Sequence, residues 1–573
     1  MRIEKLKSGI ILLPCLFFCF FLLTCGFQPG ASRTTDNVLI SRSDNADTSY
    51  YHYSLAVLHT LNQQFDKAVD EYRKALSIHE HSPFLMVELA TIYIKKNDLS
   101  SAVELLETSL LYHPDYIDTH LLLGGVYGKL KKYDNAISEY KTVIELDPAK
   151  VEPYLLLGLL YTERKNYTYA ISVLKKLMDR DSESYMGAYY LSKIYAEMEL
   201  YKEATKWMEK TVSLNPEFET ALADLGLLYQ IGNEDAKAVD VYRNYIKRNS
   251  DNITLRQRLG KLLLKLEKYD EAATEFEEIL NLDDSNKEAR FSLGIAYFFG
   301  RIDYEKALDL FKDIALENPL DERVRYFLAS VYEERGSFSE ALAEFEKISP
   351  SSDFFIPGRI HMGLIMKQQN QTADAIKLMH TTIENRKKEP ELYDFLAALY
   401  EDEKKFENAF DTLQKGLKEI PENIDLRYKI GVLYEKTGYF DESMAVMREI
   451  LQMDPENAEA LNFIGYSFAD RGINLEEAEV LITKAMELKP GNGYITDSLG
   501  WLYYRQNKIS QAISFLEKAA SLLPEDVTIA EHLADAYAKG GYARKALDVY
   551  QKILENKPED ETIRKKIKTL LNE

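Results

Sequence analysis

Hydrophobic residues recur along this chain at helical spacing, in paired segments joined by short polar turns. Residues 494–524 show the pattern most fully, with small and apolar residues at Leu499, Gly500, Tyr503, Ala512, Leu516 and Ala519. The small side chains of Gly500 and Ala512 allow two antiparallel helices to approach closely. Pro524 cannot continue a helix and ends the second segment. The pattern predicts a helix-turn-helix unit.

The same unit repeats at a fixed period. The small residue of the first helix lies at Ala56, Ala90, Gly124, Gly158, Ser192, Gly226, Gly260, Gly294, Ala329, Gly363, Ala397, Gly431, Gly465, Gly500 and Ala534. The small residue of the second helix lies at Ala68, Ala102, Ala136, Ala170, Ala204, Ala238, Ala272, Ala307, Ala341, Ala375, Ala409, Ser443, Ala478, Ala512 and Ala546. Each first-helix step is 34 residues, except for two steps of 35 that add a residue to the turns RIDYEKA and RGINLEEA. Fifteen such repeats predict one continuous solenoid in place of several globular domains.

This signature resembles that of the tetratricopeptide repeat (TPR) family. The resemblance covers residues 49–560 and implies an all-α fold, a right-handed superhelical solenoid of fifteen repeats. Residues 561–573 carry one apolar stripe with charges elsewhere, which predicts a capping helix at the open end of the array. Repeat ten, residues 356–389, matches least well and predicts a local irregularity.

The tyrosines at the third signature position are predicted to belong to the core. They are Tyr93, Tyr127, Tyr161, Tyr195, Tyr229, Tyr297, Tyr332, Tyr400, Tyr434, Tyr503 and Tyr537. A bulky ring at this position fills the space beside the small residues, so we assign these rings no function.

The charge balance limits the kinds of partner. The chain has 93 acidic residues against 71 lysines and arginines, a formal net charge of −22. Nucleic-acid binding requires clustered cations, so we expect no nucleic-acid partner. The same excess opposes unaided adhesion to an anionic membrane surface.

Residues 1–24 have the pattern of a signal peptide, with a positive start and an apolar core. They lead into Leu-Leu-Thr-Cys-Gly, which resembles a bacterial lipobox. The resemblance implies cleavage before Cys25 and lipidation of its thiol. Because Gly26, and not Asp, follows the cysteine, it also implies the periplasmic side of the outer membrane in a bacterium with two membranes. An uncleaved membrane anchor in the same segment is the alternative.

The segment after the cysteine predicts a tether. Residues 25–48 are rich in Gly, Ser, Thr, Asp and Asn and have no helical period, which favours a flexible linker. The two other cysteines, Cys15 and Cys19, lie inside the apolar core. The mature chain therefore has no disulfide to form and no thiolate metal site.

In TPR proteins the first helix of each repeat lines the concave face. The positions that the resemblance assigns to that face hold many aromatic rings, which are typical of the core of an interface. We expect a partner-binding groove at Tyr189, Tyr190, Phe291, Tyr326, Phe327, Phe395, Tyr428, Phe463, Tyr466, Asp497, Trp501 and Tyr504. For any single ring, packing against the adjacent helix is the alternative.

We find no sequence motif for catalysis. Nucleotide-binding glycine loops, a Gly-x-Ser-x-Gly elbow and a His-Glu-x-x-His metal motif are all missing from the sequence. His79 and His81 lie in a predicted turn, where a solvated loop is the favoured interpretation. We expect no enzyme activity, no cofactor, no metal and no small-molecule substrate.

The predicted function is a membrane-anchored protein–protein interaction scaffold or adaptor in the bacterial cell envelope. Residues 461–506 resemble TPR lipoproteins that are widespread in proteobacteria, some of which bring substrates to periplasmic proteases or cell-wall hydrolases. A TPR subunit of an exopolysaccharide or protein export apparatus is the alternative. An enzyme with a regulatory TPR array is disfavoured, because no span outside the repeats is long enough for an enzyme domain.

Overall fold

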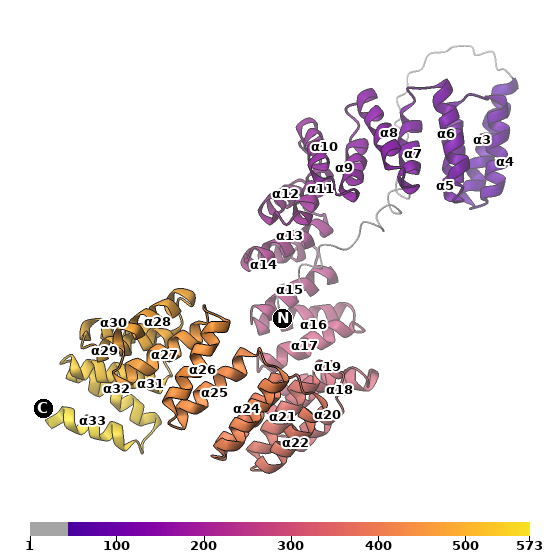
Figure 1. The fold of residues 1–573 in the computed structure, drawn as a ribbon. Coiled ribbons are helices and arrows are strands. Elements are labelled where there is room, and N and C mark those ends of the chain that lie inside the picture. Colours follow the sequence, from indigo (N-terminus) through magenta and orange to yellow (C-terminus); the bar gives the residue numbers. More distant parts are fainter. Residues whose placement is uncertain (1–43, 573) are drawn as a thin grey trace. The chain divides into compact units, whose positions relative to one another are not determined.

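The structure is a computed structural model that describes residues 44–572, and within this range it consists of α-helices without strands (Figure 1). The chain divides into two compact bodies, the first ending at Asp303 and the second beginning at Tyr304. Odd-numbered helices are the first helices of the repeats and even-numbered helices are the second. The predicted signal peptide, Cys25 and the tether as far as residue 43 lie outside the described residues.

The helices of the first body are α3 (Asp44–Leu61), α4 (Phe65–Ile78), α5 (Pro83–Lys95), α6 (Leu99–Tyr112), α7 (Ile117–Lys129), α8 (Tyr133–Leu146), α9 (Glu152–Glu163), α10 (Tyr167–Arg180), α11 (Tyr185–Glu197), α12 (Tyr201–Leu214), α13 (Glu219–Ile231), α14 (Asp235–Ile246), α15 (Ile253–Lys265), α16 (Tyr269–Leu282) and α17 (Lys287–Phe299).

The helices of the second body are α18 (Tyr304–Glu317), α19 (Glu322–Glu334), α20 (Phe338–Glu346), α21 (Phe355–Gln368), α22 (Thr372–Asn385), α23 (Pro390–Asp402), α24 (Phe406–Glu419), α25 (Ile424–Lys436), α26 (Phe440–Met453), α27 (Ala458–Arg471), α28 (Leu475–Leu488), α29 (Gly493–Arg505), α30 (Ile509–Leu522), α31 (Val527–Lys539), α32 (Ala543–Asn556) and α33 (Glu561–Asn572).

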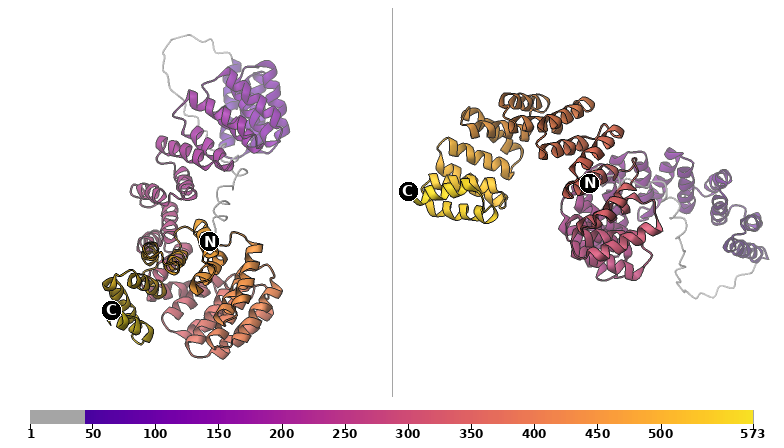
Figure 2. Two further views of the ribbon diagram at one scale, coloured as in Figure 1. Left: turned by 60° about the vertical axis from the view of Figure 1, so that its left-hand side comes forward. Right: turned by 90° about the horizontal axis from the view of Figure 1, so that it is seen from below.

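Within each body the helices stack as antiparallel pairs, and the predicted all-α TPR-type solenoid is confirmed (Figures 1 and 2). Successive first helices contact one another, as α27 does with α29 and α29 with α31. Successive second helices are not among the principal contacts of the described residues. The first helices therefore lie on the inner side of the curve, where a groove is expected.

The turn inside each repeat contains a left-handed residue, which reverses the chain after the first helix. These residues are Gln63, Asn97, Lys131, Lys165, Glu199, Asn233, Glu267, Arg301, Gly336, Asn370, Lys404, Gly438, Gly472, Asn507 and Gly541. The longer turn RGINLEEA accommodates its extra residue with a second left-handed position, since Gly472 has a φ of 67° and Asn474 a φ of 47°. Asparagine tolerates this conformation better than most residues.

The turn between repeats is held by a contact that the sequence analysis did not foresee. The donor is the side chain that lies four residues before the small residue of a first helix. It donates a hydrogen bond to the backbone carbonyl six residues before itself. Arg325 Nε donates to the carbonyl of Pro319 at 2.9 Å, and Arg427 Nη2 donates to that of Pro421 at 2.9 Å. Each bond satisfies a carbonyl that the proline turn would otherwise leave without a partner.

The last helix is half of a repeat. In α33, Ile563 is buried and Ile567 and Leu570 pack against the preceding repeat. Lys568 occupies the position at which every complete repeat has a small residue, and it is exposed. A long charged side chain at this position does not allow the close approach of a second helix that the small residues allow.

Two boundaries differ from the sequence-based expectation. Helix α3 begins at Asp44, so residues 44–48, predicted to belong to the tether, are helical. The irregularity expected in repeat ten lies one helix earlier, because α20 spans only Phe338–Glu346 whereas α21 and α22 have ordinary lengths. Pro350 follows closely and prevents α20 from continuing. None of the described helices has the length and apolar character needed to cross a membrane.

Two neighbouring glycines of α7 show why the repeat needs a small residue at one position and not at the next. A Cβ added to Gly124 would lie 2.7 Å from the ring of Tyr140, which is buried on α8, whereas one added to Gly125 would meet nothing closer than 3.7 Å. The first contact is too short for any real side chain. The second is an ordinary van der Waals contact.

We therefore expect opposite effects of alanine at the two glycines. Gly124→Ala should lower the free energy of unfolding by about 1–3 kcal/mol through overpacking. Gly125→Ala should raise it by up to about 1 kcal/mol, because alanine favours the helix and fits the available space. Urea unfolding of the two variants beside the wild type measures both effects, and equal shifts of the two midpoints would contradict this account of the packing.

Candidate functional site

In the first body, the inner face carries a strip of aliphatic side chains on α5, α7 and α9. We call it the aliphatic strip, and it consists of Val87, Leu121, Leu122, Leu156 and Leu159, all half-buried. These residues occupy the same first-helix positions as the predicted aromatic groove residues. The sequence analysis missed them because it searched for rings at these positions. Apolar side chains left partly open on a concave surface are typical of interaction sites.

Acidic groups accompany the aliphatic strip. Glu88 accepts a hydrogen bond from the Tyr72 hydroxyl at 3.1 Å. Burial raises the pKa of Glu152 above its ordinary value; Lys150 opposes this shift and Asp118 adds to it. The inner face of α5, α7 and α9 therefore combines apolar area with carboxylates.

The predicted groove residues Tyr189 and Tyr190 lie on α11 and are both buried. The Tyr189 hydroxyl donates to Asp224 Oδ2 at 3.3 Å, and Lys193 Nζ donates to the same oxygen at 3.1 Å. Burial and the nearby Asp224 carboxylate raise the pKa of Tyr189. The Tyr190 hydroxyl is buried without a hydrogen-bond partner. The Tyr189 hydroxyl thus joins α11 to α13, and a role of the two rings in partner binding stays a prediction. Phe291, on α17, is half-buried.

In the second body, the predicted residues Tyr326 and Phe327 belong to an aromatic cluster at α19. The ring centroids of Tyr326 and Phe354 are 5.2 Å apart, and those of Tyr326 and His361 are 5.8 Å apart. His361 Nδ1 lies 2.7 Å from Glu333 Oε2, which links α21 to α19. Both predicted rings are half-buried.

Three further predicted rings are half-buried on the first helices that follow, namely Phe395, Tyr428 and Phe463. Tyr428 and Phe463 meet edge to face, with ring centroids 5.8 Å apart. This contact connects α25 to α27. An edge-to-face pair of this kind stabilises neighbouring helices and leaves part of each ring open.

The remaining predicted residues meet in a column of stacked rings on α29 and α31. Trp501 stacks on His532, with centroids 4.1 Å apart, and on Tyr504, with centroids 4.7 Å apart. Lys539 Nζ lies 4.4 Å from the centre of the Tyr504 ring. The Trp501 indole N–H donates to Asp470 Oδ1 at 3.2 Å.

Asp497 and Tyr466 complete this column. Both carboxylate oxygens of Asp497 lie 3.0 Å from His532 Nδ1, which donates to them. The Tyr466 ring on α27 lies 6.3 Å from that of His532 on α31, so side chains of three repeats meet. Burial, with the nearby Asp470 and Asp497 carboxylates, raises the pKa of Tyr466.

This column changes the interpretation of Trp501. Its ring lies between His532 and Tyr504, and the residue is only 8% exposed. A partner cannot stack on a ring that has both faces covered, so the first role of Trp501 is to hold α27, α29 and α31 together. Tyr494, on the same helix, is 58% exposed.

Helix α33 is tied to the same end of the body by Lys566. Its ammonium group donates to Glu531 and Asp535, each at 2.7 Å. Burial of this group works against its charged form, but the two carboxylates outweigh that effect and raise the pKa of Lys566. The inner surface here is thus a network of paired charges. Among residues 44–572, no three His, Cys, Asp or Glu side chains come together in a way that would hold a metal ion.

Family comparisons agree with the repeat geometry. Family descriptions called "Tetratricopeptide repeat" match residues 60–124, 258–312 and 498–561, and one called "TPR repeat" matches residues 129–165. The chain is a tetratricopeptide repeat protein. The description "Intraflagellar transport protein 56" also matches residues 290–491 of this TPR protein.

Curated relatives match parts of the TPR array. The TPR repeat-containing protein PA4667 of Pseudomonas aeruginosa is 30% identical over 199 residues, which is 34% of this chain and 33% of the relative. The TPR repeat-containing protein YpiA of Bacillus subtilis is 26% identical over 25% of this chain and 33% of its own length. Human protein O-mannosyl-transferase TMTC3 is 29% identical over 26% of this chain and 17% of its own length. The match thus covers a third or less of each of these relatives.

Solved structures with a similar arrangement include the Cut9–Hcn1 hetero-tetramer of the APC/C. That chain is 15% identical, with a TM-score of 0.35 over 92% of this protein and 97% of the other. YrrB, whose structure is titled a TPR protein with an unusual peptide-binding site, is 21% identical, with a TM-score of 0.28 over 32% of this protein and 95% of the other.

We expect Trp501→Ala to act on stability first. It removes a buried indole, two ring stacks and the bond to Asp470, so the unfolding midpoint of the second body should fall by an amount equivalent to about 3–5 kcal/mol. Tyr494→Ala, on the same helix but largely exposed, should change stability by less than about 0.5 kcal/mol. Urea unfolding compares the two variants when it is followed by far-UV circular dichroism, because this signal reports helix content and not the tryptophan that is removed. Equal stability of both variants would refute the structural role of the column.

Proposed function

We propose that this TPR protein is a membrane-anchored scaffold of the bacterial cell envelope, which holds partner proteins on its inner face. TPR proteins bind other proteins, and this general property supports a scaffold role. The observation that carries the proposal is the aliphatic strip. It offers apolar side chains on three successive first helices that remain partly exposed.

The residues expected to bind a partner follow from this geometry. Apolar side chains at the centre of a concave surface, with polar groups at the rim, supply most of the energy of protein–protein binding. The aliphatic strip has that arrangement, with Glu88 and Glu152 beside it. The aromatic residues of the second body make ring contacts with neighbouring helices, so we expect them to contribute less to partner binding than the aliphatic strip does.

The anchor rests on the sequence before the described residues. A signal-type segment that ends at Cys25 and a linker of about twenty residues would tie the array to a membrane while leaving its inner face accessible. The lipobox resemblance supports the periplasmic side of the outer membrane as the location.

The strip can be tested by affinity capture with crosslinking from cells that carry the full-length protein. Leu122→Glu and Leu156→Glu place a charge in the strip and should reduce recovery of the crosslinked partners by at least tenfold. The matched control is Leu111→Glu on α6, where the leucine is already 77% exposed and faces away from the strip. An unchanged set of partners with both strip variants, while circular dichroism shows them folded, would remove the strip from the proposal.

The anchor has its own test. A palmitate analogue fed to cells should label the wild-type protein, and Cys25→Ala should lose that label and appear in the soluble fraction. Ser8→Ala, in the same predicted leader but away from the cysteine, is the control and should remain labelled. Equal labelling of the wild type and Cys25→Ala would remove the lipid anchor without affecting the scaffold role.

A further inference from the structure

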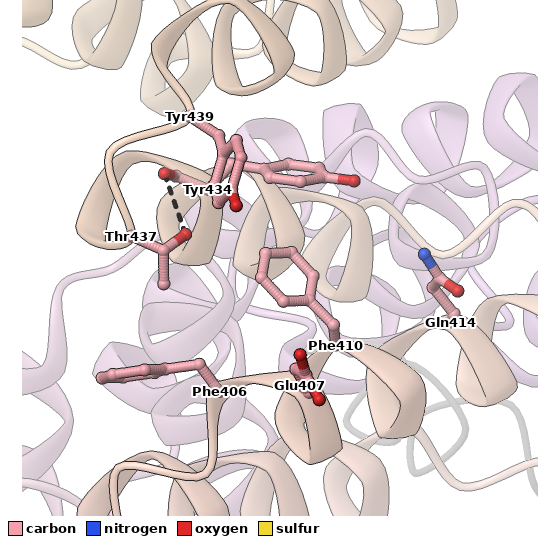
Figure 3. Close-up of a pocket in the computed structure, with 7 residues that line it drawn as sticks. All are labelled: Phe406, Glu407, Phe410, Gln414, Tyr434, Thr437 and Tyr439. Atoms are coloured by element: carbon pink, nitrogen blue, oxygen red, sulfur yellow. Dashed lines mark hydrogen bonds between the residues drawn. The ribbon is translucent and has the colours of Figure 1, made fainter.

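A hollow of about 530 Å³ opens between α24 and the end of α25 in the second body (Figure 3). Its lining residues are Phe406, Glu407, Phe410, Gln414, Tyr434, Thr437 and Tyr439. The rings of Phe410 and Tyr434 have centroids 4.6 Å apart, and those of Tyr434 and Tyr439 are 6.2 Å apart. Figure 3 shows these rings together with the carboxylate of Glu407 around one space. The hollow lies on the second-helix side of the array, apart from the predicted groove.

The ring at the centre of the hollow, Tyr434, is one of the tyrosines at the third signature position. In other repeats this ring carries a cation of the protein itself. Lys132 Nζ lies 5.8 Å from the centre of the Tyr127 ring, and Lys508 Nζ lies 5.2 Å from that of Tyr503. The same arrangement holds for Arg73 over Tyr93, Lys175 over Tyr195, Lys237 over Tyr229, Lys312 over Tyr332 and Lys545 over Tyr537.

The second feature of these sites is a carboxylate from the preceding repeat. The Tyr127 hydroxyl donates to Glu107 at 2.5 Å, and the Tyr537 hydroxyl donates to Glu517 at 2.5 Å. At Tyr127 and Tyr537 the tyrosine is therefore part of a small site that pairs an aromatic face, a cation and an acid. The cation is attracted to the electron-rich face of the ring.

The hollow at Tyr434 has the ring and an acid but lacks the cation. The repeat position that holds Lys132 and Lys508 in their repeats holds Tyr439 here. No lysine or arginine lies over the Tyr434 ring among the described residues. The nearest candidate, Lys436, lies 5.8 Å from the centre of the Phe406 ring and pairs with Glu401 at 2.8 Å.

The carboxylate of the hollow comes from a different repeat position than the carboxylates beside Tyr127 and Tyr537. The position of Glu107 and Glu517 holds Gln414, which is neutral. Glu407, about two turns earlier on α24, supplies the negative charge instead. It is exposed and makes no ion pair within residues 44–572. Four aromatic rings and an unpaired carboxylate around an open space are the elements of a cation-binding site.

We propose that this hollow binds the ammonium group of a lysine side chain on a partner protein. Two other repeats place a lysine of the chain, Lys132 or Lys508, over the tyrosine ring from the position that Tyr439 occupies here, so the chain itself shows that a lysine side chain suits this ring. The stem of a lysine can lie along the Phe410 and Tyr434 rings while its head reaches Glu407. This site does not depend on the aliphatic strip, which lies in the other body.

The probe for this site is Nα-acetyl-lysine-N-methylamide, added to the full-length protein and observed by saturation-transfer NMR. We expect saturation of the side-chain methylene protons at millimolar concentration. The norleucine counterpart, which has a similar stem but no charge, should bind at least fivefold more weakly. Tyr439→Ala and Glu407→Gln should each weaken binding of the lysine probe by about fivefold.

The chain offers a matched control in Tyr542→Ala. Tyr542 occupies the same position of its repeat as Tyr439, and the two are 54% and 55% exposed, but Lys545 already lies over its ring. This variant should bind the probe as the wild type does. A further variant, Tyr439→Lys, places the cation where Lys132 and Lys508 have it, and it should abolish binding of the probe while the circular dichroism spectrum stays unchanged.

Three outcomes would overturn the proposal. They are equal binding of the lysine and norleucine probes, unchanged binding by folded Tyr439→Ala and Glu407→Gln, and binding of choline with no measurable binding of the lysine probe. The last outcome would assign the hollow to a free quaternary ammonium compound. None of these results changes the capture experiment at Leu122 and Leu156, so the two proposals can fail separately.

Discussion

The close approach of two helices at a pair of small residues is the constraint on which this structure depends. Wherever the first helix carries Gly, Ala or Ser at its signature position, the second helix can insert a bulky side chain there, as Tyr140 does against Gly124. Each repeat then presents an apolar flank that only the next repeat can cover. In α33 the same position holds a charged residue, Lys568, which is exposed.

This constraint also decides what the inner face can offer. Because first helices lie close together on the inside of the curve, their larger side chains reach one another across repeats. In the second body this contact produces a column in which Trp501, His532 and Tyr504 cover each other's faces. On α5, α7 and α9 of the first body the corresponding positions hold leucine and valine, which are too short to meet in the same way, and apolar area stays partly open. The proposed binding surface of the first body and the stacked rings of the second body thus both follow from the same packing of first helices.

The repeated geometry makes departures from it informative. Most tyrosines at the third signature position carry a lysine or arginine of the chain itself, and Tyr434, whose repeat has Tyr439 at one of the positions that supply this cation, is among those that do not. The other repeats of the chain therefore serve as a reference with which any one repeat can be compared. A site that has its cation in several repeats and lacks it at Tyr434 indicates what Tyr434 would accept. Tyr434, which the sequence analysis assigned to the core with the other signature tyrosines, is therefore proposed to bind a lysine side chain as well.

The sequence by itself determined the helix pairs, their period, the closing helix and the small positions, because these depend on residue size and spacing that repeat at 34 residues. It also placed the candidate groove on the first helices. Only the tertiary structure decided which groove residues are accessible, since the exposure of a ring such as Trp501 depends on His532, which comes from the next repeat. The same holds for the aliphatic strip and the hollow at Tyr434. Both arise from side chains that no neighbouring element covers, and coverage is a property of three-dimensional packing that local spacing does not contain.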